Sequence, residues 1–285
     1  MKKLILFTAV AFAGFMTFTA CQKEESSQNK LEKSQLKTIS TELNMDNFDD
    51  YITFGNMHNQ SLEYYYNRLT NNPNESQYLV TTNGIVSGIH DYFDQNGMGS
   101  VSANFSNSFS DLISKFQLNS DLSNLRTNYT NGINSDIQRN LTAVQNEYFS
   151  ILYKTEDFQN ADAYNQTVTN LMNNLKLDNR LSSRDKQTIY LAASIGISSF
   201  KYWEDNHVKW QTIAAKNIAG RTATQYWKEF TKADIGGAIT GGIGGAFAGA
   251  VTVPGIGAVP GWVLGAVGGA IGGSVSWAIM DAIFG

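Results

Sequence analysis

Residues 235–280 read IGGAITGGIGGAFAGAVTVPGIGAVPGWVLGAVGGAIGGSVSWAIM, and this stretch of 46 residues contains no charged side chain. Asp234 precedes it and Asp281 follows it. Residues four apart lie on one face of an α-helix, and glycine on that face lets another backbone approach closely. The pattern predicts two helices that pair through faces marked by glycine at every fourth position, namely Gly237, Gly241, Gly245, Gly249 and Gly261, Gly265, Gly269, Gly273.

The segment between the two glycine sets predicts a turn, because it holds Pro254, Pro260 and further glycines. We therefore expect a hairpin of helices over residues 235–253 and 261–284. These would span roughly 28 and 36 Å, comparable with a hydrocarbon core of ~30 Å. Two environments stay open for the hairpin: a membrane, which tryptophans near the ends of its second helix favour, or tight packing inside a protein core.

The chain before the hairpin predicts an all-α fold, a helical bundle body over residues 45–232 followed by the glycine-rich helical hairpin over 233–285. Proline is nearly absent from the body and apolar residues recur at steps of three and four. Helices are expected over residues 45–69, 75–93, 104–118, 121–153, 161–177, 182–203 and 205–232.

The amino terminus has a basic start, an apolar run of signal-peptide length and the sequence Phe18-Thr19-Ala20-Cys21. It resembles a bacterial lipoprotein signal, which implies cleavage after residue 20 and acylation of Cys21, the single cysteine. The following Gln22-Lys23-Glu24-Glu25 resembles the surface-export signal of lipoproteins from Bacteroidetes. The resemblance implies a lipid-anchored protein at the outer membrane or cell surface, and the polar residues that follow predict that residues 21–44 form the lipidated end and a flexible tether. An ordinary secretory signal with an incidental cysteine is the alternative.

Composition argues against several functional classes. Without Lys2 and Lys3 the chain has 21 − 2 = 19 basic and 25 acidic residues, a net charge of 19 − 25 = −6. A nucleic-acid-binding protein would need a basic patch, and none is found in the sequence. The three histidines lack a metal-ligand spacing. We therefore expect no catalytic residues, no metal site, no cofactor and no nucleic-acid partner.

One short motif lies in the first expected helix, where Gly55, His58, Asn59 and Leu62 follow a Gly-x-x-His-Asn-x-x-Leu spacing. It resembles a signature of uncharacterised helical proteins from Bacteroidetes, some of which end in a glycine-rich hairpin. His58 and Leu62 share a helix face. His58 and Asn59 are accordingly expected either to hydrogen-bond at a helix crossing or to form part of a binding site.

Two functions remain open. In the first, the chain is a lipoprotein with a structural or interaction role whose hairpin touches membrane, since the hairpin resembles glycine-zipper segments of outer-membrane lipoproteins. In the second, it is a contact-dependent pore-forming effector, since the hairpin also resembles bacteriocin peptides and the hydrophobic hairpin of pore-forming colicins. A lipid membrane is the expected partner in both cases, and the glycine faces also permit a homo-oligomer.

Overall fold

A computed structural model describes residues 44–72, 79, 82–98, 141–214, 223–244, 250–254 and 256–284, and within them the fold is all-α apart from one short β-hairpin. Residues 39–285 form one compact unit. The described elements are α2 (Phe48–Asn71), α4 (Thr82–Gln95), α7 (Ala143–Leu152), the 3-10 turn η1 (Thr155–Asp157), α8 (Ala161–Leu177), α9 (Ser183–Ala214), α10 (Ala223–Gly244), β1 (Ala250–Val253), β2 (Gly257–Pro260) and α11 (Gly261–Phe284).

The helix predicted over residues 121–153 does not run unbroken to its end. α7 begins at Ala143 after a capping box, in which the Thr142 hydroxyl accepts from the Gln145 backbone N–H and the Gln145 side chain accepts from Thr142 N–H. Such a box satisfies two backbone donors that a helix start leaves unpaired. The spacing of apolar residues did not reveal this helix start, because apolar residues continue at steps of three and four past the capping residue Thr142. Residues 121–140 lie outside the described part of the chain, as does the helix predicted over 104–118.

The break predicted between residues 203 and 205 is wrong, since α9 continues from Ser183 to Ala214. Trp203 and Trp210 are both buried along it, so the stripe that faces the core has no interruption there. α10 likewise runs through the predicted boundary between body and hairpin at residues 232–233. The hairpin helix is therefore continuous with the last helix of the body.

The end predicted for the first hairpin helix, residue 253, is also wrong. Residues 250–253 form β1, which pairs antiparallel with β2 so that Val251 lies opposite Val259. β-branched residues favour strands, and Gly257 takes a φ of 101°, which glycine adopts without strain. The tip of this ribbon lies against the turn after α4, because a Cβ placed on Gly97 would be 3.2 Å from Pro254 Cγ.

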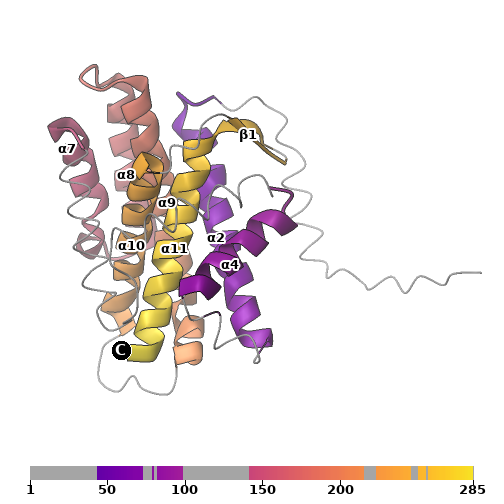
Figure 1. Ribbon diagram of the computed structural model, residues 1–285. Helices are drawn as coiled ribbons and strands as arrows, with labels where there is room; N and C mark the ends of the chain where they lie inside the picture. The colour runs from indigo at the N-terminus through magenta and orange to yellow at the C-terminus, as the bar shows by residue number, and fades with distance from the viewer. Residues whose placement is uncertain are drawn as a thin grey trace, which may run out of the picture. The chain divides into compact units, whose positions relative to one another are not determined.

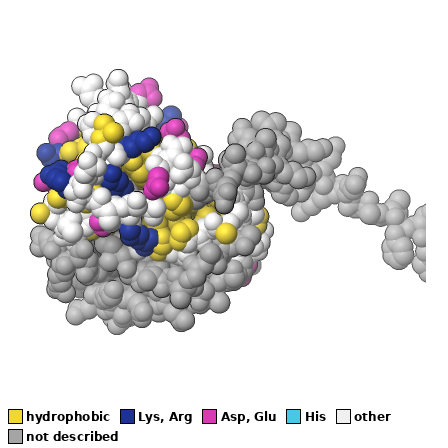
Figure 2. Space-filling model, turned by 90° about the horizontal axis from the view of Figure 1, so that it is seen from above, with side chains coloured by type: hydrophobic (Ala, Val, Ile, Leu, Met, Phe, Trp, Pro, Cys, Tyr) yellow, Lys and Arg dark blue, Asp and Glu magenta, His cyan; other side chains and the backbone are white. Residues whose placement is uncertain are grey.

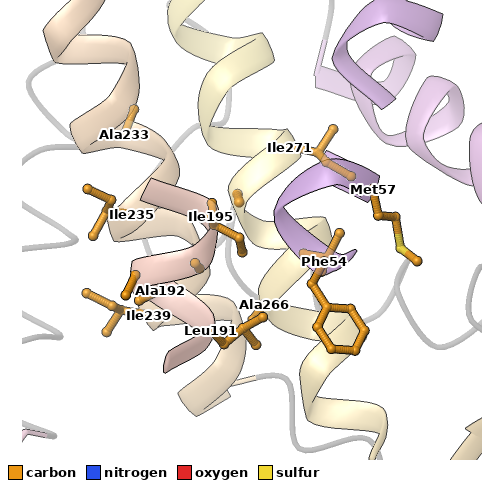
Figure 3. Packing of buried hydrophobic residues seen from close by; sticks show 14 of the residues in the cluster. Phe54, Met57, Leu191, Ala192, Ile195, Ala233, Ile235, Ile239, Ala266 and Ile271 are labelled. Atoms are coloured by element: carbon orange, nitrogen blue, oxygen red, sulfur yellow. The ribbon is translucent and has the colours of Figure 1, made fainter. Parts of the chain in front are cut away.

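α11 lies at the centre of the described bundle, in contact with α2, α4, α9 and α10 (Figure 1). Every residue from Gly261 to Ala278 is buried. Apolar residues of α11 belong to one buried core together with residues of three other helices, and Figure 3 shows several of them: Phe54 and Met57 from α2, Leu191, Ala192 and Ile195 from α9, Ala233, Ile235 and Ile239 from α10, and Ala266 and Ile271 from α11. A helix that is apolar on all sides is either such a core helix or a membrane span.

The described surface differs from this interior. Seen from above in Figure 2, basic, acidic, polar and hydrophobic side chains are interspersed. Several ion pairs tie the outer helices together: Arg68 of α2 with Asp91 of α4, Glu63 of α2 with Lys209 of α9, and Glu156 of η1 with Lys232 of α10. The charges thus lie on the surrounding helices and on the first part of α10, whereas the uncharged residues 261–278 of α11 are buried.

Candidate functional site

Several fully buried polar residues of the bundle gather around Asp234 of α10, which has no exposed surface. Its Oδ2 accepts from the Ser199 hydroxyl at 2.5 Å and from Trp203 Nε1 at 3.1 Å, both on α9. Its Oδ1 accepts from the Ser274 hydroxyl of α11 and lies 3.4 Å from His58 Nε2 of α2. Four helices therefore meet at one carboxyl group.

We call this group the Asp234 cluster, and define it as His58, Ser199, Trp203, Asp234 and Ser274. Each of the five residues is fully buried. Buried polar groups normally have hydrogen-bond partners, and every polar atom of the cluster has one except His58 Nε2. The 3.4 Å from that nitrogen to Asp234 Oδ1 exceeds a normal hydrogen bond, so the two groups are facing neighbours with a slightly open contact.

The motif around His58 explains how α2 reaches the cluster. A Cβ on Gly55 would lie 2.6 Å from the Ser194 carbonyl oxygen and 2.8 Å from Ser198 Cβ, so glycine allows α2 and α9 to approach closely. One turn later, the Asn59 side-chain amide donates to the Ser198 carbonyl at 2.9 Å. Leu62 is fully buried in the core. Gly55 and Asn59 thus serve the crossing of α2 over α9.

Asn59 also contacts His58 directly, with 3.1 Å between Asn59 Oδ1 and His58 Nδ1. The Ser198 carbonyl can only accept, so the Asn59 amide nitrogen faces it and the Asn59 oxygen faces the imidazole. His58 Nδ1 must then carry the hydrogen, because an amide oxygen accepts. The sequence placed His58 and Asn59 at a helix crossing or in a binding site, and the structure places them at a crossing, beside a buried carboxyl group.

The glycine faces of α10 and α11 meet backbone to backbone. A Cβ on Gly237 would overlap the Gly269 carbonyl oxygen and lie 3.0 Å from Ala270 Cα. A Cβ on Gly241 would overlap the Gly265 carbonyl oxygen in the same way. These two pairs define an antiparallel register in which each step of four along α10 matches a step of four along α11.

The structure describes only some of the other predicted site residues, which are four further glycines and Cys21. Gly261 and Gly273 are buried in α11. Gly245, Gly249 and Cys21 lie outside the described residues. Gly249 directly precedes β1, so the four-residue repeat extends past Gly244, the last residue of α10.

Burial dominates the electrostatics of the cluster. Desolvation raises the pKa of Asp234, while His58 and the hydrogen bonds from Ser199 and Trp203 act in the opposite direction. The neutral form of the carboxyl group is therefore favoured in this environment. His58 is the ionisable partner within ion-pair distance of Asp234 among the described residues.

The cluster contains the residue types of a serine-histidine-aspartate triad, but in a different order. Ser274 donates to the carboxyl group instead of to the imidazole, whereas a nucleophilic serine needs the imidazole as its base. No three His, Cys, Asp or Glu side chains among the described residues are grouped closely enough to hold a metal ion. What the arrangement can do chemically is bind, hold and release a proton.

The sequence analysis missed Asp234 as a site residue and treated it only as the border of the uncharged stretch. One signal was available: Ser199 and Trp203 are four apart on α9 and so share a face. An acid at the start of an apolar helix needs such partners if it is buried. Nothing in the sequence showed that α2 would supply His58 from 176 positions away, since 234 − 58 = 176.

Comparisons with known proteins give no relative for this arrangement: no family model, no curated protein and no solved structure matches the chain. Among the helices that the structure describes, none is both long enough and apolar enough for a membrane span.

Proposed function

We propose that the chain is a lipid-anchored envelope protein without catalytic activity that keeps a membrane-active glycine-zipper hairpin inside its helical bundle and delivers it to a lipid bilayer. The observation that supports this most is the burial of α11 from Gly261 to Ala278 by helices that carry the surface charges. A hairpin held this way is shielded from water until the bundle opens. Acylation of Cys21 would keep the bundle close to a membrane.

The geometry favours a stored hairpin over one that resides permanently in lipid. α10 and α11 contact α9 extensively, and α11 also contacts α2 and α4. A permanently inserted hairpin would leave the apolar faces of α2 and α9 exposed to water, which is unfavourable by roughly 25 cal/mol per Å². The proposed delivery step therefore requires the hairpin to separate from α2 and α9 while α10 and α11 stay paired.

Two disulfides test that separation. A Cβ on Gly196 of α9 would lie 2.9 Å from the Tyr164 hydroxyl, which must shift slightly, and 3.1 Å from Ile235 Cγ1 of α10. Cysteines at positions 196 and 235 are therefore close enough to lock the hairpin to α9. A Cβ on Gly242 would lie 3.4 Å from Ala266 Cβ, so cysteines there join α10 to α11 and leave the hairpin free to depart. Both pairs are made in a chain with Cys21→Ser, and leakage of dye from vesicles is measured.

We expect the oxidised Gly196→Cys/Ile235→Cys chain to release no dye and to recover release on reduction. The oxidised Gly242→Cys/Ala266→Cys chain should release dye like the unlinked chain. If no variant releases dye, reduced or oxidised, delivery of the hairpin is excluded. The structural or interaction role would then be favoured, and the tight backbone packing of Gly237 on Gly269 supports that alternative.

A second experiment tests the anchor. Because the described hairpin is enclosed, Cys21→Ser should move the protein from the membrane fraction to the soluble fraction. Truncation after Lys232 is unsuitable for this purpose, since it would cut α10 and remove the helix at the centre of the bundle. Retention of the Cys21→Ser chain in washed membranes would show that another segment anchors it.

A further inference from the structure

The hydrogen on His58 Nδ1, fixed by Asn59 and the Ser198 carbonyl, decides what the other ring nitrogen can do. In a neutral imidazole only one nitrogen carries a hydrogen. Nε2 is then bare and can only accept. It faces Asp234 Oδ1, which also only accepts when the carboxyl group is ionised. Two facing acceptors 3.4 Å apart in a fully buried site repel unless one proton lies between them.

We propose that His58 and Asp234 form a buried site that holds one proton, and that loss of this proton loosens the attachment of the α10–α11 hairpin to α2. With the proton present on the carboxyl group, the group is neutral and Oδ1 presents a hydrogen toward Nε2 across the 3.4 Å contact. With the proton lost, a carboxylate is left in the core beside a neutral imidazole. The proton leaves to solvent and no other bond changes.

The surroundings of the pair offer little to replace that proton. α9 contributes the neutral donors Ser199 and Trp203 and, further away, the Tyr202 phenol, whose pKa burial raises above its usual range. α11 contributes the Ser274 hydroxyl. Among the described residues no lysine or arginine lies within ion-pair distance of Asp234. A carboxylate in such a core has these neutral donors but no cation beside it, which is unfavourable.

The sign of the pH effect follows from linkage. Burial raises the pKa of Asp234 in the folded chain. A raised pKa means that stability is fully present at low pH, below the pKa of the unfolded aspartate, and is lost as the pH rises through the folded value. The bundle should therefore loosen as the pH rises. Since one proton is involved, the folding equilibrium constant should fall by up to about tenfold per pH unit between the unfolded and the folded pKa of Asp234, and level off above the folded value.

Asp234→Asn provides the test, because asparagine imitates the protonated carboxyl group. Its amide nitrogen can donate to His58 Nε2, and its oxygen can accept from Ser199 and Trp203. Urea unfolding of the full chain with Cys21→Ser, measured from about pH 6 upward, should give a midpoint that falls as the pH rises. The midpoint of Asp234→Asn should stay level over that range. Ser274→Ala, which removes a neutral donor and leaves the pair intact, should keep the falling profile.

Equal pH profiles for the wild type and Asp234→Asn would overturn the proposal. So would a midpoint of Asp234→Asn below the wild type at every pH, since the native group would then be a carboxylate. A spectroscopic readout covers a variant that does not fold. The wild type at neutral pH should show the infrared carbonyl stretch of a protonated carboxyl group, and an unprotonated His58 Nε2 in its nitrogen NMR shift. Absence of both signals contradicts the proton site.

The claim that proton loss loosens the hairpin rests on the proposed delivery of the hairpin to a bilayer. A third measurement tests the proton site and the delivery separately. Dye release from phosphatidylethanolamine–phosphatidylglycerol vesicles should increase with pH for the wild type and stay low for Asp234→Asn. If the urea midpoints follow the predicted profiles but neither chain releases dye at any pH, the proton site stands and the proposed function fails. If both chains release dye equally while their midpoints differ, the site does not control release.

Discussion

At the residue scale, neighbouring glycines of α10 have different roles. A Cβ on Gly241 would overlap the backbone of α11, whereas a Cβ on Gly242 would make an ordinary 3.4 Å contact with Ala266. Gly241→Ala should therefore destabilise the chain by at least about 2 kcal/mol, because helix backbones cannot yield as side chains do. Gly242→Ala should be neutral or stabilising by up to about 1 kcal/mol, the difference in helix propensity.

Urea unfolding at neutral pH compares the two variants directly. Gly237→Ala and Gly269→Ala should behave like Gly241→Ala, since each Cβ would overlap a carbonyl oxygen of the opposite helix. An equal effect of Gly241→Ala and Gly242→Ala would mean that the backbones of α10 and α11 do not touch at this register.

Asp178 provides a pH dependence of opposite sign to that of Asp234. The Arg180 side chain, its backbone N–H and the Tyr148 hydroxyl donate to Asp178 and lower its pKa. A lowered pKa means that stability is present above the pKa of an unfolded aspartate, about 3.9, and is lost as the pH falls through the folded value.

Asp178→Asn should therefore be less stable than the wild type at pH 7, and the difference should shrink as the pH falls below about 4. Thermal unfolding followed by circular dichroism at several pH values gives this comparison. A difference between the two chains that stays constant with pH would show that the carboxylate of Asp178 has no preferential interaction in the folded state.

At the element scale, the sequence predicted best those elements whose ends carry local signals. The limits of α8 and α11 are those predicted, because Asn160 caps α8 and Pro260 directly precedes α11. The spacing of apolar residues predicted wrong helix limits at two places. Apolar residues continue past the start of α7 at Thr142, and they continue through α9 near Trp203, where a break was expected. The ribbon β1–β2 was missed because each strand has only four residues, too few for a clear alternation.

The Asp234 cluster could not be predicted from local sequence signals either. Local spacing placed His58 and Asn59 on one turn of α2, but their partners lie on two helices distant in sequence, Ser198 on α9 and Asp234 on α10. A hydrogen bond such as that from Asn59 to Ser198, 139 positions apart, leaves no periodic signal. Only the regularly spaced glycines predicted a tertiary contact from the sequence. A helix face without side chains serves the close approach of another backbone.

The cap of α7 offers a test at this scale. Thr142→Ala removes the hydroxyl that accepts from Gln145 N–H, and should lower stability by about 1 kcal/mol. Ser150→Ala is the control in the same helix, since the exposed Ser150 hydroxyl only bonds the Glu147 carbonyl within its own turn. The two variants are compared by urea unfolding. If Thr142→Ala is as harmless as Ser150→Ala, the cap does not fix where α7 begins.

At the scale of the whole molecule, the core is built around a helix that is itself poor in large side chains. α11 fills the centre of the bundle, and its glycines let α10 approach it closely while larger residues of α2 and α9 cover the other sides. Aromatic rings complete this layer, with Trp203 stacked on Phe230 at 4.4 Å between centroids. The paired glycine faces of α10 and α11 consequently lie inside a layer of larger side chains, and the proposed delivery requires this outer layer to open.

Native-state hydrogen exchange can tell whether that opening occurs below global unfolding. In water at pH 7, the amides of α11 should exchange among the slowest, because the helix is buried on all sides. As the pH rises, exchange in α10, α11 and the facing parts of α2 and α9 should accelerate together once corrected for the intrinsic rate, while α8 keeps its protection. Asp234→Asn should remove the difference. If α8 and α11 lose protection in step, the bundle opens only by complete unfolding, and a separable hairpin is ruled out.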